Sequence, residues 1–348
     1  MQRSLSNADL AELLARKAET SSGILVRAFR RAARSAFLWP ERAADLAAAG
    51  RPLTELHGVG PHIAKQLKAW IDHAQERLRP PPIRRDFLTR ADARIILMSN
   101  PEWANRLRGD LQMHTAWSDG SASIREMAEA AKERRYSYIA ITDHSKGLKI
   151  AGGIDEKALD EQGGEIAKVN RSLERTGLTV LRSVEMNLNL RGEGDMDPDA
   201  LGRLDLVLGA FHSALRTKDD QTQRYVGALS NPDIQILGHP RGRIYNFRLG
   251  LKADWARVFA KAARLDKAVE IDSYPDRQDL NVALLKVAKK EGVRISIGTD
   301  AHHPEQLQFI ELGLAAALKA RIPAERIVDF MDLPELRAWV GQVRDRGG

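Results

Sequence analysis

The chain has 348 residues, with 54 lysines and arginines against 47 acidic residues and a formal net charge of +7. This length can bury a full hydrophobic core and predicts two domains, one of about 240 residues and one smaller. The absence of cysteine excludes disulfides and thiolate metal sites and fits a reducing compartment. Neither a signal-peptide core nor an apolar run of the ~18 residues that span a membrane is present, so we expect a soluble cytoplasmic protein without membrane contacts.

Positive charge is concentrated near the N-terminus. Residues 1–109 contain 19 lysines and arginines against 11 acidic residues, a net +8, and the remaining residues contain 35 against 36, a net −1. Charge clustered in this way attracts polyanions. We therefore expect the N-terminal region to carry a basic surface for an anionic partner, while the rest of the chain is nearly neutral.

Residues 7–75 read as helices with short breaks, and one of these helices carries an arginine stripe. Within residues 23–37, four arginines are spaced at i, i+3, i+4 and i+7 and so share one helix face: Arg27, Arg30, Arg31 and Arg34. Four guanidinium groups in a row suit a nucleic-acid phosphate backbone. The pattern fits equally well the solvated face of an amphipathic helix, and the stripe alone does not decide between the two.

A second feature of this region, within residues 53–67, has the pattern of a helix-hairpin-helix. Gly58 and Gly60 permit a tight turn, and Pro61 suits the first position of the following helix. Backbone N–H groups at such a helix start can hold a DNA phosphate, with Lys65 one turn further on. An ordinary helix–turn–helix connection is the alternative, but the apolar residues on both sides favour the hairpin.

Together these features resemble the small helical N-terminal domain of family X DNA polymerases, over residues 7 to about 75. The resemblance implies that the N-terminal domain, residues 1–75, binds DNA through the four arginines, the hairpin glycines and Lys65. Family members with 5′-deoxyribose-phosphate lyase activity have a lysine where this chain has Gln66, so lyase activity is not expected. Residues 76–108 are predicted to be a linker and a short helix, with no room for a polymerase palm.

Seven short apolar runs follow, and they predict buried parallel strands. They span residues 109–114, 138–144, 179–185, 204–212, 234–239, 268–272 and 294–302. Helical patterns occupy most of the gaps, at residues 124–135, 156–175, 255–265 and 280–291. This alternation predicts a closed α/β barrel. Most of the runs end on a histidine or a carboxylate, and active sites of such barrels lie at the C-terminal ends of the strands.

Six dispersed motifs give this region a second resemblance. They read DLQMHTAWSDG at 110–120, ITDH at 141–144, VE at 184–185, FH at 211–212, GHP at 238–240 and TDAH at 299–302. Their kinds and order resemble the PHP domain, named for polymerase and histidinol phosphatase, and most closely the C-terminal PHP domain of bacterial family X polymerases. The resemblance implies a distorted (β/α)7 barrel with three metal sites over residues 109–348, preceded by the helical domain.

The resemblance also implies a ligand for each metal. Gln112, His114, Glu185 and Asp300 would line the first site, Asp119, His144 and His302 the second, and Glu185, His212 and His239 the third. Imidazole and carboxylate ligands without thiolate suit Mn, Fe or Zn, so two or three divalent ions of these metals are expected. Gln112 departs from the family's His-x-His pattern, and its weaker amide ligand would loosen the first site. His303 is expected to be an exposed neighbour, and Asp272 a residue that supports the ligands.

Such a cluster suits phosphoester hydrolysis by a metal-bound hydroxide, without a protein nucleophile. Substrate phosphate also needs cations, and four basic residues follow strand ends in loops at the same mouth: Lys146, Lys149, Arg241 and Arg243. Arg243 matches the arginine of a family Gly-His-Pro-x-Gly-Arg pattern and is the first choice for phosphate binding, with Lys146 second. Lys149 and Arg241 fit solvated loop charges at least as well.

Three functions remain open on the sequence. The first is a DNA phosphoesterase, such as a 3′–5′ exonuclease or a 3′-end processing enzyme of DNA repair, because it uses both the basic region and the metals. A small-molecule phosphatase of the histidinol-phosphate type would leave the basic region without a purpose. A DNA-binding module with an inactive barrel finds support only in Gln112. Exonuclease, 3′-phosphatase and abasic-site endonuclease activities all present a phosphoester to the same cluster.

Overall fold

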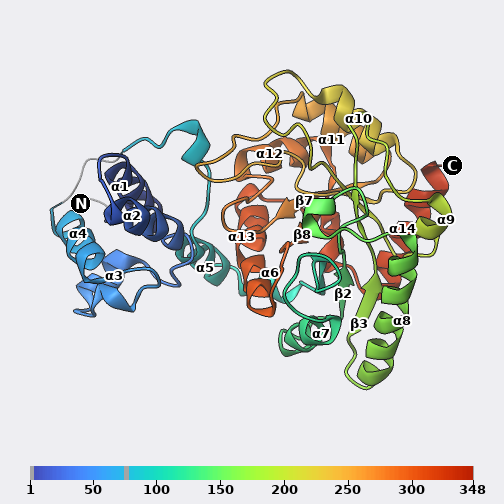
Figure 1. The fold of residues 1–348 in the computed structure, drawn as a ribbon, viewed down its shortest axis with the longest axis horizontal. Helices are drawn as coiled ribbons and strands as arrows, with labels where there is room; N and C mark the ends of the chain where they lie inside the picture. Colours follow the sequence, from blue (N-terminus) through green and yellow to red (C-terminus); the bar gives the residue numbers. More distant parts are fainter. Residues whose placement is uncertain (1–3, 74–77, 348) are drawn as a thin grey trace.

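A computed structural model describes residues 4–73 and 78–347. The predicted boundary between residues 75 and 76 lies outside the described residues. Figure 1 shows a helical unit, made of α1 to α4, beside a larger α/β unit that begins at β1, with α5 between the two. No helix in the described ranges is long and apolar enough to cross a membrane.

The helical unit contains α1 (Asn7–Glu19), α2 (Ile24–Ser35), α3 (Ala43–Ala48), the 3₁₀ turn η1 (Leu53–Glu55) and α4 (Pro61–Asp72). Its first helix begins with a capping box, in which Ser6 accepts from the backbone of Asp9 and the Asp9 carboxylate accepts in return. Its core is built around fully buried side chains from four segments: Leu10, Phe29, Trp39 and Leu67. The helical prediction for this region is therefore confirmed in residues 7–73.

The connection to the α/β unit contains η2 (Pro82–Arg84), α5 (Arg90–Met98) and α6 (Pro101–Asn105). The prediction of a single short helix is wrong, because two helices follow the linker. Asn100 stands before a proline, which disfavours helical backbone at that position. The chain therefore leaves α5 and starts a new helix with Pro101 at its first position.

The α/β unit contains two parallel sheets. One has the order β1 (Gly109–Met113), β2 (Tyr138–Ile141) and β3 (Thr179–Arg182), and the other has β4 (Glu185–Asn187), β5 (Leu208–Ala210), β6 (Ile236–Leu237), β7 (Ala268–Asp272) and β8 (Arg294–Gly298). Each predicted run contains a strand, and the run 179–185 contains β3 and also the first residue of β4. The Asp205 carboxylate accepts from the backbone N–H of Arg182 at 2.9 Å, and the chain changes sheets after this residue.

Four helices match predicted segments: α7 (Ile124–Glu133), α8 (Glu156–Leu173), α11 (Trp255–Arg264) and α12 (Val282–Glu291). Others were not predicted: α9 (Pro198–Gly202), α10 (Thr222–Ser230), α13 (Ile310–Ala320), α14 (Leu333–Gly347) and the 3₁₀ turns η3 (Lys149–Ala151), η4 (Pro304–Phe309), η5 (Ala324–Arg326) and η6 (Val328–Phe330). Helix α12 starts two residues later than expected because the Asn281 side chain caps it, accepting from the backbone of Leu284.

The two sheets are joined at two places, one near β1 and β8 and the other near β2 and β4. Parallel bridges join Met113 to Ala301 beyond β8, and His144 beyond β2 to Glu185 in β4. A buried apolar cluster takes side chains from strands of both sheets and from α14, including Leu111, Leu181, Leu208, Ile236 and Trp339. Because all paired strands are parallel, their C-terminal ends point the same way, and the residues that follow them gather at one edge.

Candidate metal centre

The carboxylate of Glu185, the first residue of β4, lies at the centre of the cluster of histidines and acids. Its Oε1 lies 2.7 Å from Nε2 of His239 and 2.9 Å from Nε2 of His212. Its Oε2 lies 3.2 Å from Nε2 of His114 and 3.5 Å from Nδ1 of His144. The structure thus brings four predicted histidines from four different strand ends around one buried carboxylate.

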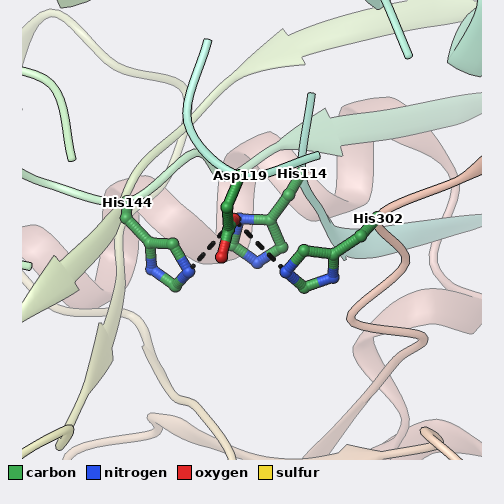
Figure 2. Close-up of side chains that lie close together, drawn as sticks. All are labelled: His114, Asp119, His144 and His302. Carbon is green, nitrogen blue, oxygen red and sulfur yellow. Dashed lines mark ion pairs between the residues drawn. The ribbon is translucent and has the colours of Figure 1, made fainter. Parts of the chain in front are cut away.

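Asp119 brings together a second group (Figure 2), in which its carboxylate lies among His114, His144 and His302. Its Oδ1 is 3.5 Å from Nε2 of His144 and 3.3 Å from Nε2 of His302. The ring of His114 stacks between the other two, with centroid separations of 4.3 and 4.4 Å. The side chain of Asp119 is 36% exposed, so this part of the cluster opens to solvent.

Asp300 completes a third group with His114 and Glu185, and its Oδ1 lies 3.0 Å from Nε2 of His114. Gln112 lies beside this group and donates from its amide nitrogen to Glu185 Oε2 at 3.2 Å. Its own Oε1 is buried and has no hydrogen-bond partner among the described residues. All nine predicted ligands therefore lie in one cluster.

Neighbouring groups orient these side chains. Nδ1 of His212 lies 3.1 Å from the side-chain oxygen of Asn187, and Nδ1 of His302 lies 2.7 Å from the carbonyl of Asp300. The loop that carries Asp119 is held by Asp143, which accepts from the hydroxyls of Thr115 and Ser118. Such partners fix ring orientation and tautomer at metal sites.

The cluster keeps three of its carboxylates ionised. Burial raises the pKa of Glu185, but the charges of His144, His239 and His212 outweigh burial and hold it well below its usual range. The pKa of Asp119 is likewise lowered against burial by His144 and His302, and that of Asp300 by Arg277 and His114. These three carboxylates can therefore serve as anionic ligands.

Two buried acids beside the cluster behave in the opposite way. Burial raises the pKa of Glu270 and of Asp272 well above the usual range, and neighbouring carboxylates raise both further. Glu270 accepts from the backbone N–H of His239 at 2.7 Å, so it supports a ligand instead of adding a charge. Asp272 also supports a ligand, here through Arg277: its Oδ2 lies 3.7 Å from Arg277, which pairs with Asp300.

The donor set fits divalent metal ions. Nδ1 of His114 and Nδ1 of His144 are buried without a hydrogen-bond partner in the described ranges. Ligand atoms lie within 4.8 Å of one another in three groups: His114, Asp119, His144 and His302; His144, Glu185 and His212; and His114, Glu185 and Asp300. Converging imidazole and carboxylate lone pairs at this spacing are typical of Mn, Fe or Zn sites.

Three residues of the site were not predicted from sequence. Arg277, in the loop after β7, forms a short ion pair with Asp300. Glu270 reads as one more strand residue, and Asn187 ends a strand without a histidine or acid. Gly298, at the end of β8, leaves room for this packing, because a Cβ there would lie 2.3 Å from Glu270 Oε1 and 2.8 Å from Gln112 Cβ.

The two residues predicted to bind phosphate pair with residues other than the predicted metal ligands. Lys146 is exposed and pairs with Glu156 at 2.6 Å. Arg243 is buried, donates to the carbonyls of Arg277 and Asp86, and stacks on Phe87 with 3.7 Å between its guanidinium carbon and the ring centroid. In this structure Arg243 thus holds the linker to the α/β unit, and phosphate binding by it stays a prediction.

Three other residues from this part of the sequence analysis have clear positions. Arg241 donates to the carbonyl of Leu249, and Lys149 begins η3. His303 is exposed and lies outside the ligand groups, and its ring accepts from the backbone of Glu305 at the start of η4. The expectation that His303 is a neighbour of the ligands agrees with this position.

The residues predicted to bind DNA lie on the helical unit. Arg27, Arg30, Arg31 and Arg34 are exposed on α2, and Lys65 is exposed on α4. Gly60 is the N-cap of α4 and Pro61 its first residue. Gly58 has a φ of +75°, and a Cβ there would lie 2.6 Å from Ser35 Oγ, so the turn packs directly on the end of α2.

The chain was compared with known proteins. The PHP domain family model matches residues 110–300. The DNA polymerase/3′-5′ exonuclease PolX of Bacillus subtilis is 36% identical over 236 residues, which cover 68% of this chain and 41% of that protein. This chain therefore spans less than half the length of that relative.

Two further matches cover most of the other protein. A probable phosphatase of Caldicellulosiruptor bescii is 30% identical over 216 residues, which cover 60% of this chain and 84% of the relative. Among solved structures, a histidinol phosphate phosphatase of Lactococcus lactis, in complex with zinc, L-histidinol and phosphate, matches with a TM-score of 0.47 and 16% identity, over 61% of this chain and 93% of that one. From the family match over residues 110–300, the chain belongs to the PHP domain family and is a hydrolase.

Proposed function

We propose that this protein is a metal-dependent phosphoesterase that acts on DNA ends, as a 3′–5′ exonuclease or a 3′-end processing enzyme. In this proposal residues 109–348 form a distorted (β/α)7 barrel, with β3 and β4 as the two halves of one barrel strand. Residues 1–75 form the helix-hairpin-helix domain, and residues 76–108 link it to the barrel. The bridges between the two sheets support this arrangement.

The observation that carries the proposal is the cluster around Glu185, which gathers histidines and acids that lie in or near six strands of the α/β unit. We assign the first site to Gln112, His114, Glu185 and Asp300, the second to Asp119, His144 and His302, and the third to Glu185, His212 and His239. Bound divalent ions would neutralise phosphoryl charge and lower the pKa of water, which is the chemistry that phosphoester hydrolysis needs.

The protein's own residues hold this cluster in shape. Arg277 keeps Asp300 ionised and oriented, and Glu270 fixes the backbone at His239. Asp119, His302 and His212 are the more exposed members, so a phosphoester would approach from their side. We assign Lys146, an exposed cation two residues after His144, to the substrate phosphate.

The arginine stripe supports a nucleic-acid substrate. The four exposed arginines of α2 form no ion pair with a described residue, so their charge is available to phosphates. Because the Gly58 turn packs on the end of α2, the stripe and the start of α4 belong to one surface. The name of the Bacillus subtilis relative, which includes a 3′-5′ exonuclease, is consistent with this substrate.

A small-molecule phosphatase is the second candidate, favoured by the match to a probable phosphatase over most of its length. The test is to incubate Mn-loaded protein with end-labelled DNA that carries a 3′-OH, a 3′-phosphate or an internal abasic site, and separately with histidinol phosphate. Shortening of the 3′-OH strand would identify the exonuclease, and loss of the 3′-phosphate alone the end-processing enzyme. Turnover of histidinol phosphate with intact DNA would reject the proposal.

A further inference from the structure

A cavity of about 170 Å³ lies between the helical unit and the α/β unit, outside the ligand cluster. The helical unit contributes Arg34, Phe37 and Leu38 to its wall, and the α/β unit contributes Tyr245, Tyr274 and Phe309. The cavity therefore exists only because the two units pack together. Its volume is comparable with the roughly 150 Å³ apolar cavity that holds benzene in an engineered protein.

The wall is unusually rich in rings. Phe37 and Tyr245 meet edge to face with centroids 4.8 Å apart, and Tyr274 and Phe309 do so at 5.2 Å. Aromatic side chains bind planar ligands, and nucleobases in particular, through their faces and edges. The wall also contains polar side chains, Ser35, His57 and Asp276, which favours a ligand with polar ring edges over a purely apolar one.

Tyr274 connects the cavity to the metal centre. Its ring centroid lies 5.5 Å from the guanidinium carbon of Arg277, which pairs with Asp300. Its hydroxyl accepts from Gln306 at 3.3 Å, and Gln306 in turn accepts from the backbone N–H of His302 at 2.7 Å. A ligand against Tyr274 would therefore lie next to the side of the cluster that holds Asp300 and His302.

Two arginines lie close to the cavity. Arg34, the last arginine of the stripe, is exposed and lines the cavity together with Asp276, and the guanidinium carbon of Arg277 lies 5.5 Å from the ring centroid of Tyr274. A nucleotide whose base occupied the cavity would have one phosphate on the side of Arg277 and the metal centre. The phosphates of the rest of the strand would run toward the arginine stripe.

We infer that this cavity binds the unpaired nucleobase of the terminal nucleotide of a nucleic-acid strand, and so places the adjoining phosphoester at the metal centre. This inference rests on the proposed function and adds a substrate preference to it. A base must leave its stack to enter such a cavity, and an end that is already single-stranded or mismatched loses least by doing so. Unpaired ends are therefore preferred over paired ends.

The test uses single-stranded oligonucleotides that differ only in the 3′-terminal residue, which carries either a base or a tetrahydrofuran without a base. Wild-type kcat/KM should be roughly tenfold or more higher for the strand with the base, since stacking of one base has an effect of this size. Leu38→Trp, which fills the cavity from the helical unit, should lower kcat/KM for that strand to the level of the baseless strand. Leu38→Met is the matched control and should retain the difference.

A binding measurement covers the case in which Leu38→Trp does not fold. The fluorescence of a 3′-terminal 2-aminopurine, measured in chelator, should be quenched by wild type and by Tyr274→Phe but not by Tyr274→Leu. Equal cleavage of the two strands, or no quenching by wild type, would overturn the cavity assignment while leaving DNA cleavage in place. Hydrolysis of a small phosphoester without cleavage of either strand would overturn the proposed function, and this inference with it.

Discussion

Arg84 is a buried arginine that joins the helical unit, the linker and the α/β unit. Its guanidinium donates to both carboxylate oxygens of Glu12 at 2.8 and 3.0 Å, to Glu19 at 2.7 Å and to the side chain of Asn246 at 3.1 Å. It thereby ties the linker to α1 and to the α/β unit. The side chains of Arg84 and Glu12 are only 7% and 2% exposed, so Arg84→Ala would leave a buried carboxylate short of its main partner.

Loss of one partner from a buried ion pair costs about 3–5 kcal/mol. Glu12 would keep its contact with Arg16 at 2.9 Å, so we expect a loss near the lower end, about 3 kcal/mol, in the unfolding transition of the helical unit. Urea unfolding followed by circular dichroism, with each transition fitted separately, measures this change.

The matched control is Arg51→Ala. Arg51 also pairs with two carboxylates, Glu41 and Glu55, but all three side chains are at least 40% exposed. Its removal should cost far less than the removal of Arg84, because ion pairs between exposed side chains contribute little to stability. If the two variants were equally stable, the contacts of Arg84 would not hold the two units together, and the reasoning would fail.

Three further predictions concern the metal centre. His212→Ala and His239→Ala should each lower turnover of a phosphoester at least ~100-fold. DNA affinity should stay close to wild type, because the arginine stripe lies on the helical unit. Wild-type turnover in either variant would refute the third metal site. Gln112→His should preserve or raise activity when metal is limiting, because imidazole is the better ligand. A metal titration of activity checks this, and a large loss of activity would mean that the amide has another role. Gly298→Ala should destabilise the protein by about 1–3 kcal/mol and weaken metal binding, because its Cβ would lie 2.3 Å from Glu270 Oε1. Calorimetry with and without metal measures both effects. Unchanged stability and metal affinity would contradict the close packing.

The position of the ligands could be predicted because it depends on two regular features. Each ligand from His114 to His302 lies in or close to an apolar run, and parallel strands bring their C-terminal ends to one edge. That reasoning needs no knowledge of individual side-chain contacts. The four helices that were found have a clear period, and α6 and α9 are too short to show one. Length does not explain why α13 and α14 were missed, because they have 11 and 15 residues.

Residues that act through loops could not be predicted in this way. Arg277 lies five residues after Asp272, in a loop without periodic pattern, and only the folded loop brings it to Asp300. Arg243 follows His239 by four residues, but its loop turns through Gly242, with a φ of +58°, and packs the guanidinium on Phe87. The break between β3 and β4 was missed because the apolar run continues across it, and only pairing with different neighbours divides it.

The most direct test of the central claim, that the helical unit holds DNA while the α/β unit hydrolyses it, is the salt dependence of cleavage. Removing residues 1–75 is a poor test, because Tyr245 packs in the core of the helical unit. The better variant changes Arg27, Arg30, Arg31 and Arg34 to glutamine.

For this variant, the slope of log kcat/KM for DNA against log salt should become shallower by about 3, since each phosphate contact contributes 0.7–0.9. Hydrolysis of a small phosphoester should stay at the wild-type rate. An unchanged slope with DNA, at the same rate of small-phosphoester hydrolysis, would show that the stripe is only a solvated helix face and would contradict the account.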